Sequence, residues 1–134
     1  MTVEEMMKKN EEFKKKGLLL SPDDLMERLL LRDSMRTESN KLKQEVVLAK
    51  LELDKEKAKK IIEYKSVKDE NGKALTEKVI EANIKQNFYD KDVEIIVKKS
   101  VSDLLYERAE SIIDFINIVK MDLKSKNEAF IPNV

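Results

Sequence analysis

The chain contains no cysteine and no histidine among its 134 residues. Without cysteine it has no disulfide or thiol nucleophile, and without either residue it lacks the usual zinc ligands and the commonest general base. Neither a GxxxxGK[ST] nor a GxGxxG motif occurs, so both familiar phosphate-binding loops are missing. We therefore expect no enzyme, no catalytic residue, no metal site and no cofactor. The lack of cysteine also fits a reducing cytoplasm.

Turn-forming and aromatic residues are scarce as well, with two glycines, two prolines and seven aromatic side chains. All-β folds need many more turn residues, whereas the abundant Lys, Glu, Leu, Ile and Ala suit helices. The longest apolar runs are 18–20 and 29–31, far too short to cross a bilayer, and the N-terminus has no signal-peptide core. These features predict an all-α, cytoplasmic protein without membrane contact.

No single sign of charge dominates, because 27 basic residues balance 27 acidic ones. This balance argues against a surface that attracts nucleic acid everywhere, but it allows a local basic patch. Charged residues make up 40% of the chain and hydrophobic residues 41%, so apolar positions must be used efficiently to form a core. Such a composition is typical of long helices and coiled coils.

Helix boundaries are marked at several points. Residues 3–16 form a short amphipathic stretch that ends at Gly17, and the segment 21–24 (Ser-Pro-Asp-Asp) is a strong helix start. No breaker follows until Asn71-Gly72, although the stretch 32–41 is so poor in apolar residues that we expect a bend or break there. After the turn at 69–73, the pattern predicts a short helix over 76–88 and a long one over about 91–126.

These elements predict a long antiparallel helical hairpin, a coiled-coil-like bundle with short accessory helices. Residues 1–20 form an N-terminal helix and linker with few apolar anchors, so we expect them to be loosely held. Residues 21–134 form a single hairpin domain. In the first long helix, Leu42, Val46, Ala49 and Leu53 make one apolar stripe, which then drifts to Leu51, Ala58, Ile61 and Ile62.

The final helix carries the strongest apolar seam, with spacings that alternate between four and three residues. Its members are Leu105, Ala109, Ile112, Ile116, Val119 and Leu123. Between 112 and 123 the apolar surface wraps most of the helix, so one partner helix cannot cover it. We expect a second subunit to cover the seam and the chain to be a homo-oligomer. The alternative is cover from within the chain, by the N-terminal helix and the helix at 76–88.

Lysine is concentrated between residues 41 and 68, a segment with nine lysines and five acidic residues. Phosphates need cations and bases need a π-face, so a basic helix with an accessible aromatic side chain suits single-stranded nucleic acid. The alternative is an ordinary solvated helix face with weak ion pairs. The candidate contacts are Lys43, Lys50, Lys57, Lys59, Lys60, Tyr64 and Lys65.

Three stretches resemble the UvsY-type recombination mediators of T-even and related phages. Residues 59–66 (KKIIEYKS) resemble the family's basic helix end, and 90–93 (DKDV) resemble the entry to its last long helix. Asp114-Phe115, with 123–126 (LKSK) and Phe130, resembles that helix and its ending. The resemblance covers about residues 40–130.

The resemblance implies a non-enzymatic, oligomeric accessory protein that binds single-stranded DNA. It further implies contacts with a RecA-like recombinase and with a single-strand-binding protein. Carried over by position, the DNA contacts would be Lys59 and Lys60, with Tyr64 nearby, and the final helix would join subunits. The residues by themselves leave a second hypothesis open: a phage or bacterial helical interaction module, such as a host-factor inhibitor or scaffold, that binds no nucleic acid.

Overall fold

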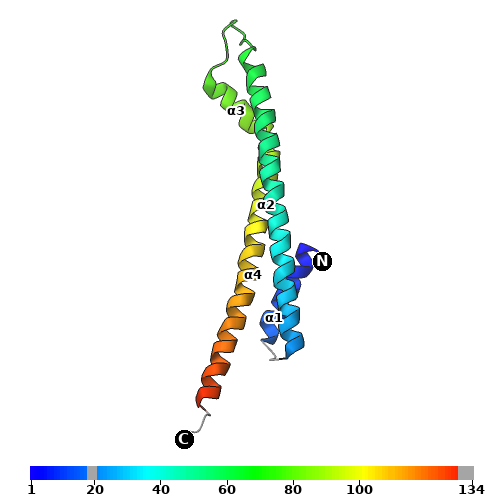
Figure 1. Ribbon diagram of the computed structural model, residues 1–134. Helices are drawn as coiled ribbons and strands as arrows, with labels where there is room; N and C mark the ends of the chain where they lie inside the picture. The colour runs from blue at the N-terminus through cyan, green and yellow to red at the C-terminus, as the bar shows by residue number, and fades with distance from the viewer. Residues whose placement is uncertain (18–20, 130–134) are drawn as a thin grey trace. The chain divides into compact units, whose positions relative to one another are not determined.

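The computed structural model describes residues 1–17 and 21–129, with side chains described as far as residue 126. In this part the chain forms four α-helices and no β-strand beyond one isolated bridge, so the predicted all-α fold is confirmed (Figure 1). The apolar run Leu18–Leu20 and Phe130, which entered the sequence predictions, lie outside the described residues.

Helix α1 spans Val3–Lys16. The Thr2 hydroxyl caps it by accepting a hydrogen bond from the Glu5 amide at 3.2 Å, and Gly17 ends it with a φ of 67°. Its Met6 and Phe13 side chains are buried. These two anchors pack α1 against the rest of the chain, although the sequence suggested a loosely held segment.

Helix α2 spans Pro22–Lys65 without interruption. The Ser21 hydroxyl accepts a hydrogen bond from the Asp24 amide at 3.0 Å, as the predicted start requires. The predicted bend over residues 32–41 is wrong. This stretch holds Met35 fully buried and places Ser39 and Arg36 in bonds to the last helix, so polar contacts replace the missing apolar ones.

The predicted turn and short helix follow α2. Asp69 accepts hydrogen bonds from the Asn71 and Lys73 amides through Oδ1, and Gly72 adopts a φ of 77°, which glycine reaches without strain. Helix α3 spans Glu77–Asn87 and is capped by Thr76. Helix α4 spans Tyr89–Ala129, so it begins two residues before the predicted start.

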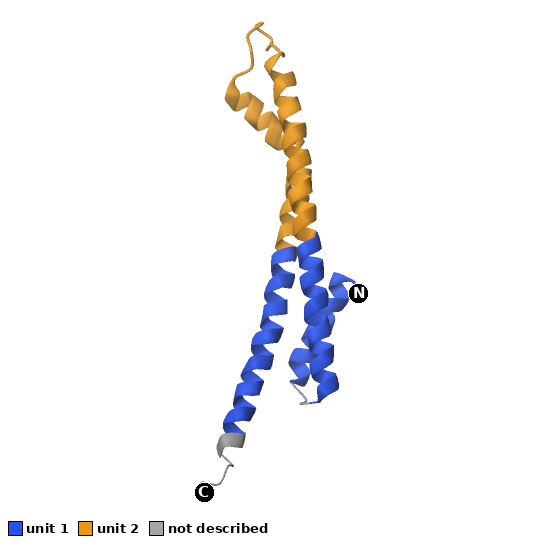
Figure 2. Ribbon diagram, in the orientation of Figure 1, with its two compact units in different colours: residues 1–41, 102–134 blue, residues 42–101 orange. Residues whose placement is uncertain are grey.

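The chain divides into two compact units, and each long helix contributes a part to both (Figure 2). Unit 1 contains residues 1–41 and 102–134, with α1, the first part of α2 and most of α4. Within it Arg36 pairs with Glu110 and Ser39 bonds to Ser102, which shows that α2 and α4 run antiparallel. Its buried apolar residues are Met6, Phe13, Leu31, Met35, Leu105, Ala109, Ile112 and Ile116.

Unit 2 contains residues 42–101: the rest of α2, the turn, α3 and the start of α4. Its α2 and α4 segments are also antiparallel, since Lys57 pairs with Asp92 and Glu45 pairs with Lys98. Val46, Leu53 and Ile95 form its buried cluster, with Ala49 and Phe88 packed against it. This cluster confirms the stripe predicted from Leu42 to Leu53 as the side of α2 that faces α4.

Candidate nucleic-acid interface

The lysines of α2 in unit 2 fall into two groups, and the first belongs to the packed side. Lys57 is half-buried, and its ammonium donates to both Asp92 carboxylate oxygens, at 2.9 and 3.1 Å. Across the same helix pair, Lys91 donates to Glu56 at 2.6 Å. Lys57 therefore links α2 to α4, and a DNA phosphate would have to displace Asp92 to reach it.

Lys60 lies three residues after Lys57, and Tyr64 lies four residues after Lys60, so all three are on the same side of α2. Lys60 pairs with Glu63 at 3.0 Å, and its Nζ lies 5.7 Å from the centroid of the Tyr64 ring. The hydrogen bond to Glu63 and the charge of that carboxylate raise the pKa of Lys60 above its ordinary value. Lys60 is thus charged and paired within α2, in an exposed ion pair that contributes little to stability.

The Tyr64 ring is half-buried, and its hydroxyl accepts a hydrogen bond from the Asn87 side-chain amide at the end of α3. A base-stacking aromatic needs an open face. Tyr64 instead joins α2 to α3. Its ring therefore lacks the open face that the predicted stacking on a base requires.

The second group of lysines is exposed. Lys50, Lys59 and Lys65 from the predicted set, together with Lys55, make no ion pair within 4 Å in the described part of the chain. Lys43 is exposed as well, but it has an interaction partner. The predicted set is therefore divided: Lys57 and Tyr64 join α2 to other helices, and Lys60 is paired within α2. Lys50, Lys59 and Lys65 face solvent without an ion pair in the described structure.

An apolar stripe runs along the side of α2 that faces away from α4. We call Leu48, Leu51, Ala58 and Ile62 the outer stripe. The relative exposure of Leu51 is 56% and that of Ile62 is 68%, whereas Leu53 on the packed side is only 5% exposed. Lys55 and Lys65 continue the spacing of the stripe, and Lys59 follows Lys55 by one turn. Exposed lysines and exposed apolar side chains thus share one surface of unit 2.

The sequence contained the signal for this outer stripe. The apolar positions Leu51, Ala58, Ile61 and Ile62 drift away from the Leu42–Leu53 stripe, which by itself predicts one face that changes direction. The structure places Leu51, Ala58 and Ile62 on the side of α2 opposite the buried stripe, whereas Ile61 is half-buried beside Ile80 and Ile84 of α3. A single helix pattern shows two stripes but does not show which of them the partner helix covers.

Most residues of the predicted subunit interface are buried within unit 1. Leu105, Ala109, Ile112 and Ile116 are buried in the single chain, while Val119 and Leu123 are half-buried. The alternative stated for the N-terminal helix describes this region better, since α1 buries Phe13 beside Ile112 and Phe115. These four buried positions are not open to a second subunit. In the same part of α4, Phe115, Ile118 and Met121 are among the large hydrophobic side chains that stay exposed, so self-association stays a prediction with different candidate residues.

Acidic side chains do not gather into a site in the described part of the chain. No group of three or more metal-ligating residues is found there. No helix among the described residues is both long and apolar enough to cross a bilayer.

Comparisons with protein-family models, with curated proteins and with solved structures gave no match. The resemblance to the UvsY-type mediators therefore rests on the residues quoted for it alone.

Proposed function

We propose that the chain is a non-enzymatic, oligomeric accessory protein that binds single-stranded DNA and assists a RecA-like recombinase in the presence of a single-strand-binding protein. The observation that carries the DNA part is the outer surface of unit 2. There, Lys55, Lys59 and Lys65 are exposed, make no ion pair in the described structure and lie along the outer stripe. The recombinase and the single-strand-binding protein come from the family resemblance.

On this proposal the lysines neutralise phosphates and the apolar side chains between them contact the faces of bases. Glu52 and Asp54 lie on the same segment of α2, so the field of one such surface is partly cancelled. A single copy should consequently bind weakly. Several copies held together would bind a strand far more tightly, because each further contact becomes intramolecular.

The test replaces the two neighbouring lysines together, as K55E/K59E. Binding of a fluorescent oligo-dT should weaken at least about tenfold, and the slope of log affinity against log salt should fall by about 1.4, roughly 0.7 for each lost phosphate contact. The matched control is K120E/K124E, which reverses two exposed lysines at the same spacing on α4. Equal binding by the wild type and K55E/K59E, or equal losses in both variants, would remove the DNA surface from α2.

A second candidate is a helical interaction module that binds no nucleic acid. The outer stripe favours it, because an exposed row of apolar residues at helical spacing is what helix-in-groove recognition uses. It predicts that Leu51→Glu abolishes assembly while K55E/K59E leaves it intact, and that the wild type binds no oligonucleotide even at low salt. Sedimentation of the three proteins with and without oligo-dT separates the two functions.

A further inference from the structure

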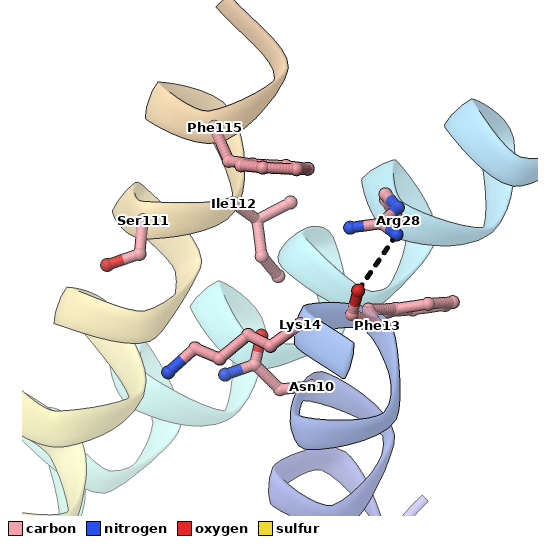
Figure 3. Close-up of a pocket in the computed structure, with 7 residues that line it drawn as sticks. All are labelled: Asn10, Phe13, Lys14, Arg28, Ser111, Ile112 and Phe115. Carbon is pink, nitrogen blue, oxygen red and sulfur yellow. Dashed lines mark hydrogen bonds between the residues drawn. The ribbon is translucent and has the colours of Figure 1, made fainter. Parts of the chain in front are cut away.

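Unit 1 contains a cavity between α1, α2 and α4 that the proposed function does not use. Its volume is about 160 Å³, and its lining residues are Asn10, Phe13, Lys14, Arg28, Ser111, Ile112 and Phe115 (Figure 3). An apolar cavity of about 150 Å³ is enough to hold a benzene ring. This cavity therefore has room for one small ring or a short branched chain.

One edge of the cavity carries hydrogen-bond donors. Asn10 is only 3% exposed, and its Nδ2 has no hydrogen-bond partner in the described structure. Lys14 follows one turn later and also lines the cavity, so the two side chains share a face of α1 (Figure 3). A buried donor without an acceptor costs free energy, which a ligand oxygen would recover.

The charge at this edge is available to a ligand. Among the described residues Lys14 pairs only with Glu11, at 3.6 Å, and about half of each side chain is exposed. An exposed pair at that distance is weak. A carboxylate that enters the cavity can take the place of Glu11 beside the Lys14 ammonium at little cost.

The remaining walls are apolar or already bonded. Phe13, Ile112 and Phe115 supply the apolar surface. The Arg28 guanidinium lies 4.7 Å from the Phe13 ring centroid and 5.4 Å from that of Phe115. It bonds to Asp24 and to the Phe13 and Gly17 carbonyls, so it holds the wall in place and its charge is balanced.

We propose that this cavity binds a small carboxylic acid with a compact apolar body, of about the size of benzoate. The ring or branched chain lies among Phe13, Ile112 and Phe115, one carboxylate oxygen accepts from Asn10 Nδ2, and Lys14 balances the charge. The site is separate from the outer surface of unit 2, so it stands or falls independently of DNA binding.

The probe is 4-fluorobenzoate, followed by ¹⁹F NMR against the full-length protein, with neutral 4-fluorotoluene for comparison. For a ligand of this size we expect a dissociation constant of about 1 mM. Fluorotoluene should bind at least about fivefold more weakly, because it offers no acceptor to Asn10 and no charge to Lys14.

Two variants test the polar edge. Lys14→Gln, at an exposed position, and Asn10→Ala should each weaken fluorobenzoate binding at least about fivefold and leave fluorotoluene unchanged. Lys15→Gln, which changes a neighbouring exposed lysine outside the cavity lining, should have no effect. Equal binding of both probes, or a Lys14→Gln variant that binds like the wild type, would overturn the proposal. The absence of fluorobenzoate binding at about 20 mM would also overturn it, and would indicate that a water molecule accepts the hydrogen bond from Asn10 Nδ2.

Discussion

At the scale of single residues, the most informative contact is one that helical periodicity does not predict. Ser39 and Ser102 are fully buried in unit 1, and each hydroxyl donates to the backbone carbonyl of the other residue at 2.8 Å. Serine in a helix is usually a solvated or capping residue. Here each hydroxyl donates to the carbonyl oxygen of the facing serine, so α2 and α4 can pack closely at a point without a large apolar side chain.

Ser102→Val should therefore destabilise the protein. The larger side chain must fit between two helices in contact, and the Ser39 carbonyl loses the hydrogen bond that the Ser102 hydroxyl donates. We expect a loss of about 1–3 kcal/mol in the free energy of unfolding, measured by urea denaturation. Ser100→Val, on the exposed side of the same helix, is the matched control and should change the free energy by less than about 0.5 kcal/mol. Equal effects would show that Ser102 is not packed as described.

The roles of the lysines also had to be read from the structure. Sequence identified the basic segment, but it could not tell that Lys57 bonds to Asp92, because those residues are far apart in the chain. It likewise could not assign Tyr64 to Asn87. Lys55, Lys59 and Lys65 retain an open charge because their positions on α2 point away from α4, whereas Lys50 is exposed although it lies two turns before Lys57 on nearly the same side.

At the scale of elements, sequence predicted most of the fold. Ser21, Gly17 and Thr76 are local signals that fix helix ends, and the turn at Asn71-Gly72 follows from residue type alone. The break expected over residues 32–41 was wrong because apolar count was the only criterion available. Met35 is fully buried in that stretch, and Arg36 and Ser39 bond to α4.

The two sides of α2 can be distinguished by one pair of matched substitutions. Leu53→Ala removes a side chain from the buried cluster of unit 2 and should lower the free energy of unfolding by about 2–4 kcal/mol. Leu51→Ala makes the same chemical change on the outer stripe and should cost less than about 1 kcal/mol in the unassociated chain. Urea denaturation at low protein concentration provides both values. A reversed order would mean that α4 packs against the other side of α2.

At the scale of the whole molecule, the central question is what the exposed surfaces bind. More than half of each large apolar side chain is exposed in the outer stripe of α2 and at Ile118 and Met121 of α4. Large exposed apolar patches mark interaction sites. We propose that assembly brings copies of the lysine-bearing surface together, so that a weak and partly cancelled charge becomes an effective contact with a long anionic strand.

The most direct test is sedimentation velocity of the full-length wild type, alone and with fluorescent oligo-dT, at a low and a moderate salt concentration. We predict that the chain sediments as more than one copy at both salt concentrations, that the oligonucleotide co-sediments at low salt, and that moderate salt releases it without dissociating the protein. A single copy at both salt concentrations with no bound oligonucleotide would contradict the account.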